Sequence, residues 1–315
     1  MRVSVLGSAA GGGFPQWNCA CRNCSRLRGG GTPYRARTQA QVAVCASAVD
    51  SPAPQWFLLN ASPDLRTQII STKVLSPARG LRDTPIAAVV LTSADVDSVS
   101  GLLHLREFQP LRIYATPSVR RILLEDNHIF RVLERASPPV SWHDIPLRTW
   151  FPLEPVSASR EATSLRCRAV PLPGAYPDYV SENVRRSLPA EEAVIGLLLA
   201  QGDKQMLYAP SLPGGSEEWK DWARSSDLCL LDGTFWDENE LIAAGAGSKT
   251  AREIGHVSLS GPGGLLAEFG PAKSGRWVLI HINNTNPVLD EAGPENREVR
   301  DAGWEIAYDG MEFEL

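Results

Sequence analysis

The sequence predicts an α/β fold built around buried strands. Apolar runs of strand length occur at residues 86–91, 227–231 and 277–280, and such uninterrupted runs are typical of strands buried on both faces. Strands come first along the chain and then alternate with helices in two halves, as expected of an α/β protein. Apolar residues make up 43% of the 315 residues and charged residues 21%, so the chain has enough apolar material for a large core.

The elements are expected in a simple order along the chain. A first strand at residues 2–7 runs into a glycine-rich turn, and a hairpin is expected between residues 193–200 and 205–208, around Gln201-Gly202-Asp203. Helices are expected at residues 101–107 and 119–124. The other predicted strands cover residues 42–46, 56–59, 86–91, 111–115, 227–231 and 277–280. No stretch has the composition of a convincing linker between domains.

Charge and hydropathy exclude several classes of protein. The net charge of −5 argues against a nucleic-acid binder that relies on a positive field. No apolar run approaches about 18 residues, so we expect no membrane-spanning helix and no membrane insertion. The first residues lack the basic region and the long apolar region of a secretory signal. We therefore expect a cytoplasmic protein with no nucleic-acid partner.

Three of the six cysteines lie close together, at Cys19, Cys21 and Cys24. Such close neighbours cannot all pair with one another and the other three are scattered, so a reduced chain is favoured over a disulfide framework. Three thiols on one tight turn suit a tetrahedral zinc site with a fourth ligand from far along the chain. A closed site of this kind is structural rather than catalytic. The alternative is three ordinary loop cysteines.

Two carboxylates follow the predicted strand at residues 86–91. They are Asp95 and Asp97, and the ends of buried strands are where α/β proteins usually place their sites. Both carboxylates could bind a hard or borderline cation. The alternative is a solvated turn in which Asp97 or Ser98 caps a helix.

Two further strand ends carry candidate residues. Asp232 ends one apolar run and His256 lies in a Gly-His-x-Ser context, so the carboxylate could orient the imidazole as an acid–base pair. The alternative is that His256 caps a helix or is satisfied in a loop. His281 directly follows the last apolar run and begins an amide-rich string. It is either a ligand on a rigid element or a structural histidine.

Together these blocks resemble the metallo-β-lactamase superfamily. Its signature, His-x-His-x-Asp-His, follows a buried strand, with a glycine three residues after the last histidine. The strand at residues 87–91 and Gly101 fall in register with that pattern. Only the aspartate position keeps the family residue, as the ligand positions fall on Ser93, Asp95, Asp97 and Ser98.

The resemblance implies a fold and several roles. The implied fold is an αββα sandwich, two central mixed sheets flanked by helices, in a single domain over residues 1–315. The later histidine of the superfamily matches His281. The blocks around Asp232 and His256 are similar to elements of the tRNase Z-like branch, which implies that His256 is the general acid and Asp232 its partner. Members of that branch carry a Cys-x-Cys-x-x-Cys zinc knuckle, here at about residues 17–26. A histidine completes it in related phosphodiesterases, and Asn284, a poor zinc ligand, stands at that position.

Longer strings, such as residues 281–287, resemble a family of pyrroloquinoline quinone (PQQ) biosynthesis proteins within the superfamily. The ligand set and this resemblance imply a mononuclear site in which Asp95, Asp97 and His281 hold iron. The implied reaction is O2-using hydroxylation of a tyrosine-derived (Glu-Tyr) precursor, and Asn283 and Asn284 are expected to bind the substrate. That family usually has a histidine after Asp97, where this chain has serine.

Three functions follow from these resemblances. The first is the iron-dependent hydroxylase of PQQ biosynthesis. The second is a non-catalytic carrier or accessory protein that helps to transport PQQ or its precursor to the periplasm. The third, a tRNase Z-like phosphodiesterase, is disfavoured because the histidine pair is missing, and a β-lactamase is not expected. The implied cofactors are a structural zinc and an active-site iron or other divalent metal. The implied partners are the small precursor or PQQ and other PQQ biosynthesis proteins, and a homodimer is left open.

Overall fold

The computed structural model describes residues 1–30, 33–47, 51–77, 81–107, 109–135, 140–155, 164–214, 217–272 and 274–315. In these ranges the strands form two mixed seven-stranded sheets, with the orders β14-β1-β2-β3-β4-β5-β6 and β13-β12-β11-β10-β9-β8-β7. The chain divides into two compact units. The first unit comprises Met1–Leu6, Gln41–Lys204 and Glu312–Leu315, and the second comprises Gly7–Ala40 and Gln205–Met311. The single domain over residues 1–315 stays a prediction.

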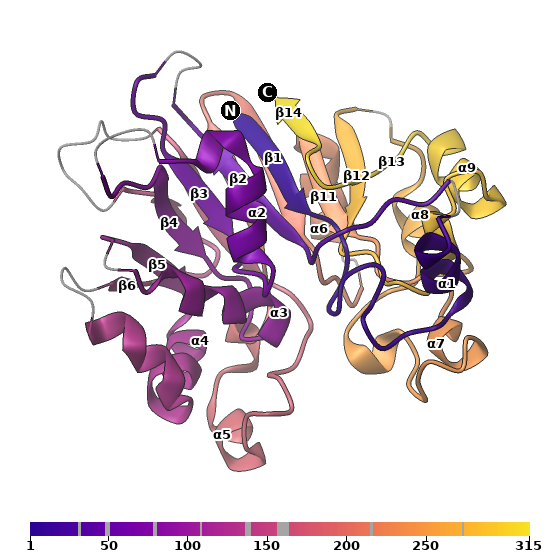
Figure 1. Cartoon of the computed structure of the whole chain (residues 1–315), viewed down its shortest axis with the longest axis horizontal. Helices are drawn as coiled ribbons and strands as arrows, with labels where there is room; N and C mark the ends of the chain where they lie inside the picture. The colour runs from indigo at the N-terminus through magenta and orange to yellow at the C-terminus, as the bar shows by residue number, and fades with distance from the viewer. Residues whose placement is uncertain are drawn as a thin grey trace. The chain divides into compact units, whose positions relative to one another are not determined.

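The first unit contains most of the predicted strands. Its pairing is antiparallel at β1–β14, β2–β3, β7–β8 and β8–β9, and parallel from β3 to β6. Figure 1 shows the two chain ends side by side, where the Met1 amino group donates to the Leu315 carbonyl at 2.9 Å. The strands are β1 (Arg2–Gly7), β2 (Gln41–Cys45), β3 (Trp56–Leu59), β4 (Ile86–Val90), β5 (Arg112–Ala115), β6 (Ser141–Asp144), β7 (Trp150–Pro152), β8 (Arg166–Pro171), β9 (Ile195–Gln201) and β14 (Glu312–Glu314).

The helices of the first unit are short. The Thr116 hydroxyl accepts from the Val119 amide and so caps α4, which packs beside β5 and β6. The α-helices are α2 (Leu65–Ser71), α3 (Val96–Val99), α4 (Pro117–Arg121) and α5 (Glu182–Ser187). Turns of 3-10 helix cover η1 (Lys73–Leu75), η2 (Ser100–Leu105), η4 (His128–Arg135) and η5 (Ala190–Glu192), and α4 continues as a π-helical segment, η3 (Ile122–Asp126).

The second unit contains four parallel strands. They are β10 (Lys204–Ala209), whose first residue belongs to the first unit, β11 (Leu228–Asp232), β12 (Arg276–Ile280) and β13 (Glu305–Ile306). All of β11 is buried, and so is β12 after its first residue. The helices are α1 (Arg22–Arg28), α6 (Glu217–Ser225), α7 (Glu240–Ala243), η6 (Arg252–Ile254), α8 (Leu265–Phe269), η7 (Pro287–Leu289) and α9 (Pro294–Asp301).

The predicted strands all appear, most within a residue or two of the expected ends. The helix expected at residues 101–107 is instead a 3-10 turn, η2. The reason lies at Gly101, whose amide donates to the Ala61 carbonyl at 2.9 Å. Because this amide bonds outside the helix, the hydrogen-bond ladder of α3 does not continue into the turn. A Cβ at Gly101 would lie 2.1 Å from the Ser62 carbonyl oxygen, so only glycine fits at this crossing. The helix expected at residues 119–124 is divided between α4 and η3.

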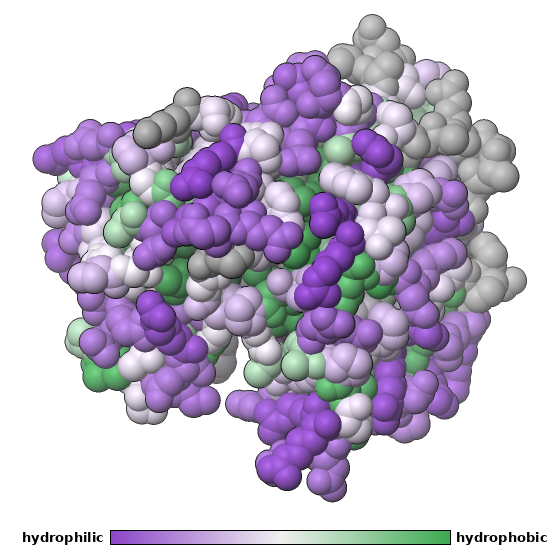
Figure 2. All heavy atoms as spheres, turned by 180° about the vertical axis from the view of Figure 1, so that it is seen from behind, coloured by the Kyte–Doolittle hydropathy of each residue, from purple (hydrophilic) through white to green (hydrophobic). Residues whose placement is uncertain are grey.

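The surface is mainly hydrophilic on the face shown in Figure 2, where apolar residues form small patches between polar ones. Within the described ranges, no helix has the length and the apolar composition needed to cross a bilayer.

Candidate functional site

The parallel pairing of β11 and β12 brings two predicted site residues to one sheet edge. Asp232 ends β11 and lies opposite Ile280, the last residue of β12, so His281 follows at the same edge. His281 has a φ of 61°, a left-handed conformation that is uncommon for a residue other than glycine. Such conformations persist only where surrounding contacts hold them, and they cluster at functional sites.

Asp232 is fully buried and accepts four hydrogen bonds. Its Oδ2 accepts from the Leu212 amide at 2.8 Å and lies 2.7 Å from His256 Nδ1, while its Oδ1 accepts from the amide and the hydroxyl of Thr234 at 3.0 and 2.6 Å. Burial raises the pKa of Asp232, but the charge on His256 and these hydrogen bonds outweigh burial and hold that pKa below its usual range. The carboxylate therefore orients His256, whose side chain is 12% exposed.

Thr234 joins the two histidines. Its Oγ1 lies 3.1 Å from His256 Nδ1 and 2.9 Å from His281 Nδ1, and the hydroxyl is also 2.9 Å from the His281 carbonyl. The two imidazoles stack with centroids 5.3 Å apart. Donor atoms of Asp232, His256 and His281 all lie within 4.8 Å of one another. Because both Nδ1 atoms face this network, Nε2 is the nitrogen through which either ring would meet a metal or a substrate.

The three predicted knuckle cysteines also come together. The Sγ atoms of Cys19, Cys21 and Cys24 lie within 4.8 Å of one another, just before and within the first turn of α1. The side-chain amide of Asn284 faces all three thiols, at 3.1, 3.5 and 3.4 Å respectively. Burial raises the pKa of Cys21, but hydrogen bonds from Cys24, Cys19 and Asn284 outweigh burial and lower it. The cluster thus offers three convergent sulfur ligands, with Asn284 on the fourth side.

Next to this cluster, the Thr285 hydroxyl links Asn283 to Glu240. Asn283 Nδ2 donates to Thr285 Oγ1 at 2.6 Å, and the Thr285 hydroxyl donates to Glu240 Oε1. Glu240 begins α7 and is 8% exposed. Burial raises the pKa of Glu240 to about 7, although its hydrogen bonds act in the opposite direction.

The other two predicted ligands belong to the first unit. Asp95 occupies the N-cap position of α3, and its side chain accepts from the Ser93 hydroxyl at 2.7 Å rather than from a backbone amide of the helix. Asp97 lies in the first turn of that helix. Ser93 and Ser98 are both buried, and their hydroxyls lie 3.4 Å apart. The segment before them is fixed by Asn60, whose Oδ1 accepts from the Thr92 amide at 2.8 Å.

The structure therefore brings Asp232, His256 and His281 together, and separately the three cysteines with Asn284. The grouping of His281 with Asp95 and Asp97 around one metal stays a prediction, as does substrate binding by Asn283 and Asn284.

The comparisons with known proteins identify the family. The family model described as a β-lactamase superfamily domain matches residues 55–282. Coenzyme PQQ synthesis protein B of Pseudomonas paraeruginosa is 40% identical, and that of Methylorubrum populi 41% identical, each over the full length of both chains. The chain belongs to the coenzyme PQQ synthesis protein B family. It is thus a PQQ biosynthesis protein with a metallo-β-lactamase fold, as the sequence predicted.

Solved structures agree with this family. The crystal structure of zinc-bound PqqB from Methylobacterium extorquens superposes with a TM-score of 0.88 at 39% identity and covers all of both chains. A diphosphatase of the PhnP family matches with a TM-score of 0.65 over the whole of this chain and 97% of its own. At 19% identity that second likeness concerns the fold alone.

Two residues of the site were not predicted as functional. Thr234 stood inside the Asp232-Gly-Thr block, and its position two residues after a strand-end carboxylate is the only local indication of its role. Glu240 carries no local indication, because its partner, Thr285, is 45 residues away. Only the fold brings the two together.

Proposed function

We propose that this chain catalyses the iron-dependent, O2-using hydroxylation of a tyrosine-derived (Glu-Tyr) precursor in PQQ biosynthesis. The observation that carries the proposal is the His256–Asp232 pair at 2.7 Å, fixed by Thr234 beside His281. A buried carboxylate that orients an imidazole is the arrangement of a general acid or base. The family supports the pathway, and the chemistry of the side chains supports the reaction.

The proposed iron ligands are Asp95, Asp97 and His281. This set is close to the two-histidine, one-carboxylate triad of non-haem iron oxygenases, with a carboxylate in place of one imidazole, and three ligands would leave positions open for O2 and substrate. His281 Nδ1 lies 2.9 Å from Thr234 Oγ1, as expected of a ligating histidine whose second nitrogen is held by a neighbouring group. Iron bound there would supply the activation of O2.

The proposed roles of the protein side chains follow from their hydrogen bonds. Both oxygens of Asp232 are occupied, so this carboxylate positions His256 and does not itself meet the substrate. His256 would hold or transfer a proton at Nε2, since Nδ1 faces Asp232. In the balanced reaction, one oxygen atom of O2 replaces a ring hydrogen as a hydroxyl group. The other oxygen atom of O2 takes up two electrons and two protons from a two-electron reductant and leaves as water.

We also propose that Cys19, Cys21 and Cys24 hold one structural zinc. A converging set of three thiols fits this soft cation, and the PqqB of Methylobacterium extorquens, 39% identical, was solved with zinc bound. The Asn284 amide stands on the fourth side, and rotation about its last bond would present its oxygen in place of its nitrogen.

A single reconstitution tests the reaction. The protein is loaded anaerobically with ferrous iron, supplied with the Glu-Tyr dipeptide and ascorbate, and then exposed to air. Mass spectrometry should show a product that has gained one oxygen atom on the tyrosine ring. We expect product from the wild type and from His128→Gln, because His128 is exposed and outside the described cluster. The His256→Gln and Asp97→Ala variants should form much less product than the wild type.

Two results would contradict the hydroxylase. One is the absence of product from iron-loaded wild type. The other is equal product from wild type and Asp97→Ala, which would assign the oxidation to free iron. Stoichiometric binding of PQQ without turnover would support the carrier instead.

A further inference from the structure

Residues 281–286 form a segment that we call the amide segment. Besides the backbone bonds of Ile282 to Ser8 and Ala10, both at 2.9 Å, it has three anchors within the second unit. Its first anchor is the end of β11. The Asn283 amide donates to the Thr234 carbonyl at 3.1 Å, and Asn286 Nδ2 donates to the Gly233 carbonyl at 2.9 Å. Through these bonds the segment follows the strand end that also carries Asp232.

The second anchor is the cysteine knuckle. Asn23, the second residue of α1, is buried, and its Nδ2 donates to the carbonyls of Asn284 at 3.1 Å and Asn286 at 2.9 Å. The Asn284 side chain faces the three thiols in return. The knuckle and His281 therefore share one short stretch of backbone, with Asn284 only three residues after His281.

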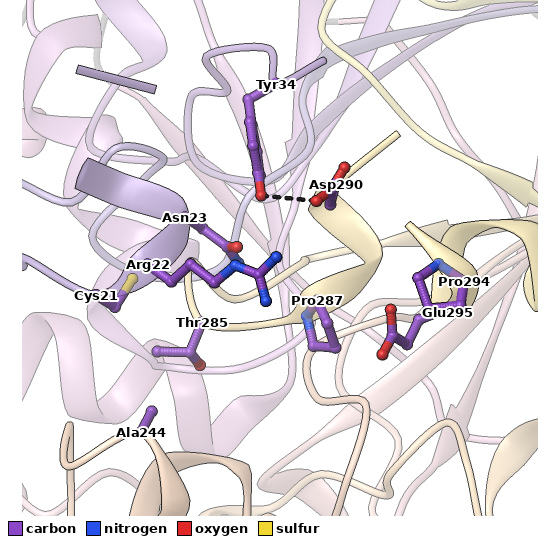
Figure 3. A pocket seen from close by; sticks show the side chains of 10 residues that line it. All are labelled: Cys21, Arg22, Asn23, Tyr34, Ala244, Thr285, Pro287, Asp290, Pro294 and Glu295. Atoms are coloured by element: carbon purple, nitrogen blue, oxygen red, sulfur yellow. Dashed lines mark hydrogen bonds between the residues drawn. The ribbon is translucent and has the colours of Figure 1, made fainter. Parts of the chain in front are cut away.

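The third anchor is Glu240. Its Oε2 accepts from the Trp236 amide at 2.6 Å, and its Oε1 accepts from the Thr285 hydroxyl. Thr285 accepts in turn from Asn283. Thr285 lines a pocket of about 400 Å³ together with Cys21 and Ala244, the residue after α7. Figure 3 shows these side chains. Of these three anchors, the Glu240 contact is the one that comes from neither β11 nor the knuckle.

We infer that Glu240 is a positioning residue for His281, acting through Thr285 and Asn283. His281 is the residue of the segment that most needs holding, because its φ of 61° is an uncommon conformation. His281 is also held through Thr234, by stacking on His256 and by the backbone bonds of the next residue, Ile282. Without the Glu240 contact, residues 283–285 lose the fixed acceptor on the other side of this arrangement. The inference rests on the proposed function only where it concerns turnover.

The test uses the ring signals of the five histidines in the zinc-loaded, iron-free full chain, assigned by single His→Gln variants. Glu240→Ala should shift or broaden the His281 signals and leave those of His104 and His128 unchanged. Glu240→Gln keeps an acceptor oxygen and should restore the wild-type spectrum. Glu218→Ala, which changes an exposed glutamate on α6, should have no effect. Wild-type His281 signals in folded Glu240→Ala would overturn the inference. Thr285→Val provides the same test should Glu240→Ala fail to fold.

A double-mutant cycle tests whether the anchors act on the same segment. Asn23→Ala removes the knuckle contacts and Glu240→Ala the third anchor, so their effects on the His281 signals should be non-additive. Strict additivity would contradict a shared segment. With the dipeptide, Glu240→Ala should lower kcat about tenfold with little change in KM, and a change in KM alone would contradict positioning. Absence of turnover in the wild type would defeat the proposed function, while the ring signals would still decide the role of Glu240.

Discussion

Glu240→Gln should remove a pH-dependent penalty from the stability of the fold. Glu240 is buried on α7, and burial raises its pKa to about 7 from an ordinary value of 4.5. In the unfolded chain the carboxyl loses its proton near pH 4.5. Between these two pH values the native state binds more protons than the unfolded state, so this group makes the protein less stable as the pH rises.

The size of the effect follows from the two pKa values. A tenfold change in a protonation constant is worth about 1.4 kcal/mol. The full penalty is therefore about 3 kcal/mol, of which about 2.5 kcal/mol develops between pH 5 and pH 8. A glutamine at position 240 is neutral at every pH and keeps an oxygen that can accept from Thr285. The free energy of unfolding of the variant therefore lacks this pH-dependent penalty.

The assay is urea unfolding of wild type and Glu240→Gln, followed by tryptophan fluorescence at pH 5 and at pH 8. Other titrating groups act equally in both proteins and cancel in the difference. The free energy of unfolding of the variant relative to the wild type should rise by about 2.5 kcal/mol between the two pH values. Glu218→Gln, at an exposed site on α6, should follow the wild type. Parallel profiles for wild type and Glu240→Gln would refute the buried, high-pKa carboxyl.

Three further outcomes are expected. Wild type should keep one zinc per chain through dialysis, measured by elemental analysis. Cys21→Ser should lose it and Cys167→Ala, in β8, should keep it. Gly101→Ala should cost about 3 kcal/mol or more in urea unfolding, because the added Cβ would lie 2.1 Å from the Ser62 carbonyl oxygen. Thr234→Val should lower kcat on the dipeptide about 10- to 100-fold, and Thr234→Ser, which restores the hydroxyl, should recover most of it.

The edge of the sheet that carries the histidines could be predicted from sequence. Apolar runs with polar residues directly after them marked β11 and β12, and the parallel register then placed Asp232 opposite Ile280 and His281 beside it. The knuckle could also be predicted, because three thiols on six residues have few other uses. In both cases a local pattern was enough, since the partners lie close in sequence or at the ends of adjacent strands.

Several short helices were not predicted. α9 contains only one buried apolar residue, Val299, and α6 only Trp219 and Ala223, so neither has the three or four apolar residues in two turns that mark a helix packed on a core. Their ends did carry usable patterns. Gly293 and Pro294 open α9, and acidic residues begin α6 with Arg224 in its last turn. The contacts of Glu240 and Asn23 could not be predicted, because each joins residues that are distant in the chain.

Serine stands at two signature positions where the superfamily has histidine, and the contacts of these serines affect which metal chemistry the site supports. Ser93 and Ser98 are buried and their hydroxyls lie 3.4 Å apart, so each of these side chains has a protein partner at the position where the superfamily places an imidazole. Neutral hydroxyls are weaker ligands than imidazoles for zinc, and a hydrolytic centre needs a well-ligated metal to generate hydroxide. His256 and Asp232 keep their pairing nevertheless. Under the proposed function this pair moves a proton, and the absence of imidazoles at two ligand positions favours oxidation at a single metal over hydrolysis at two.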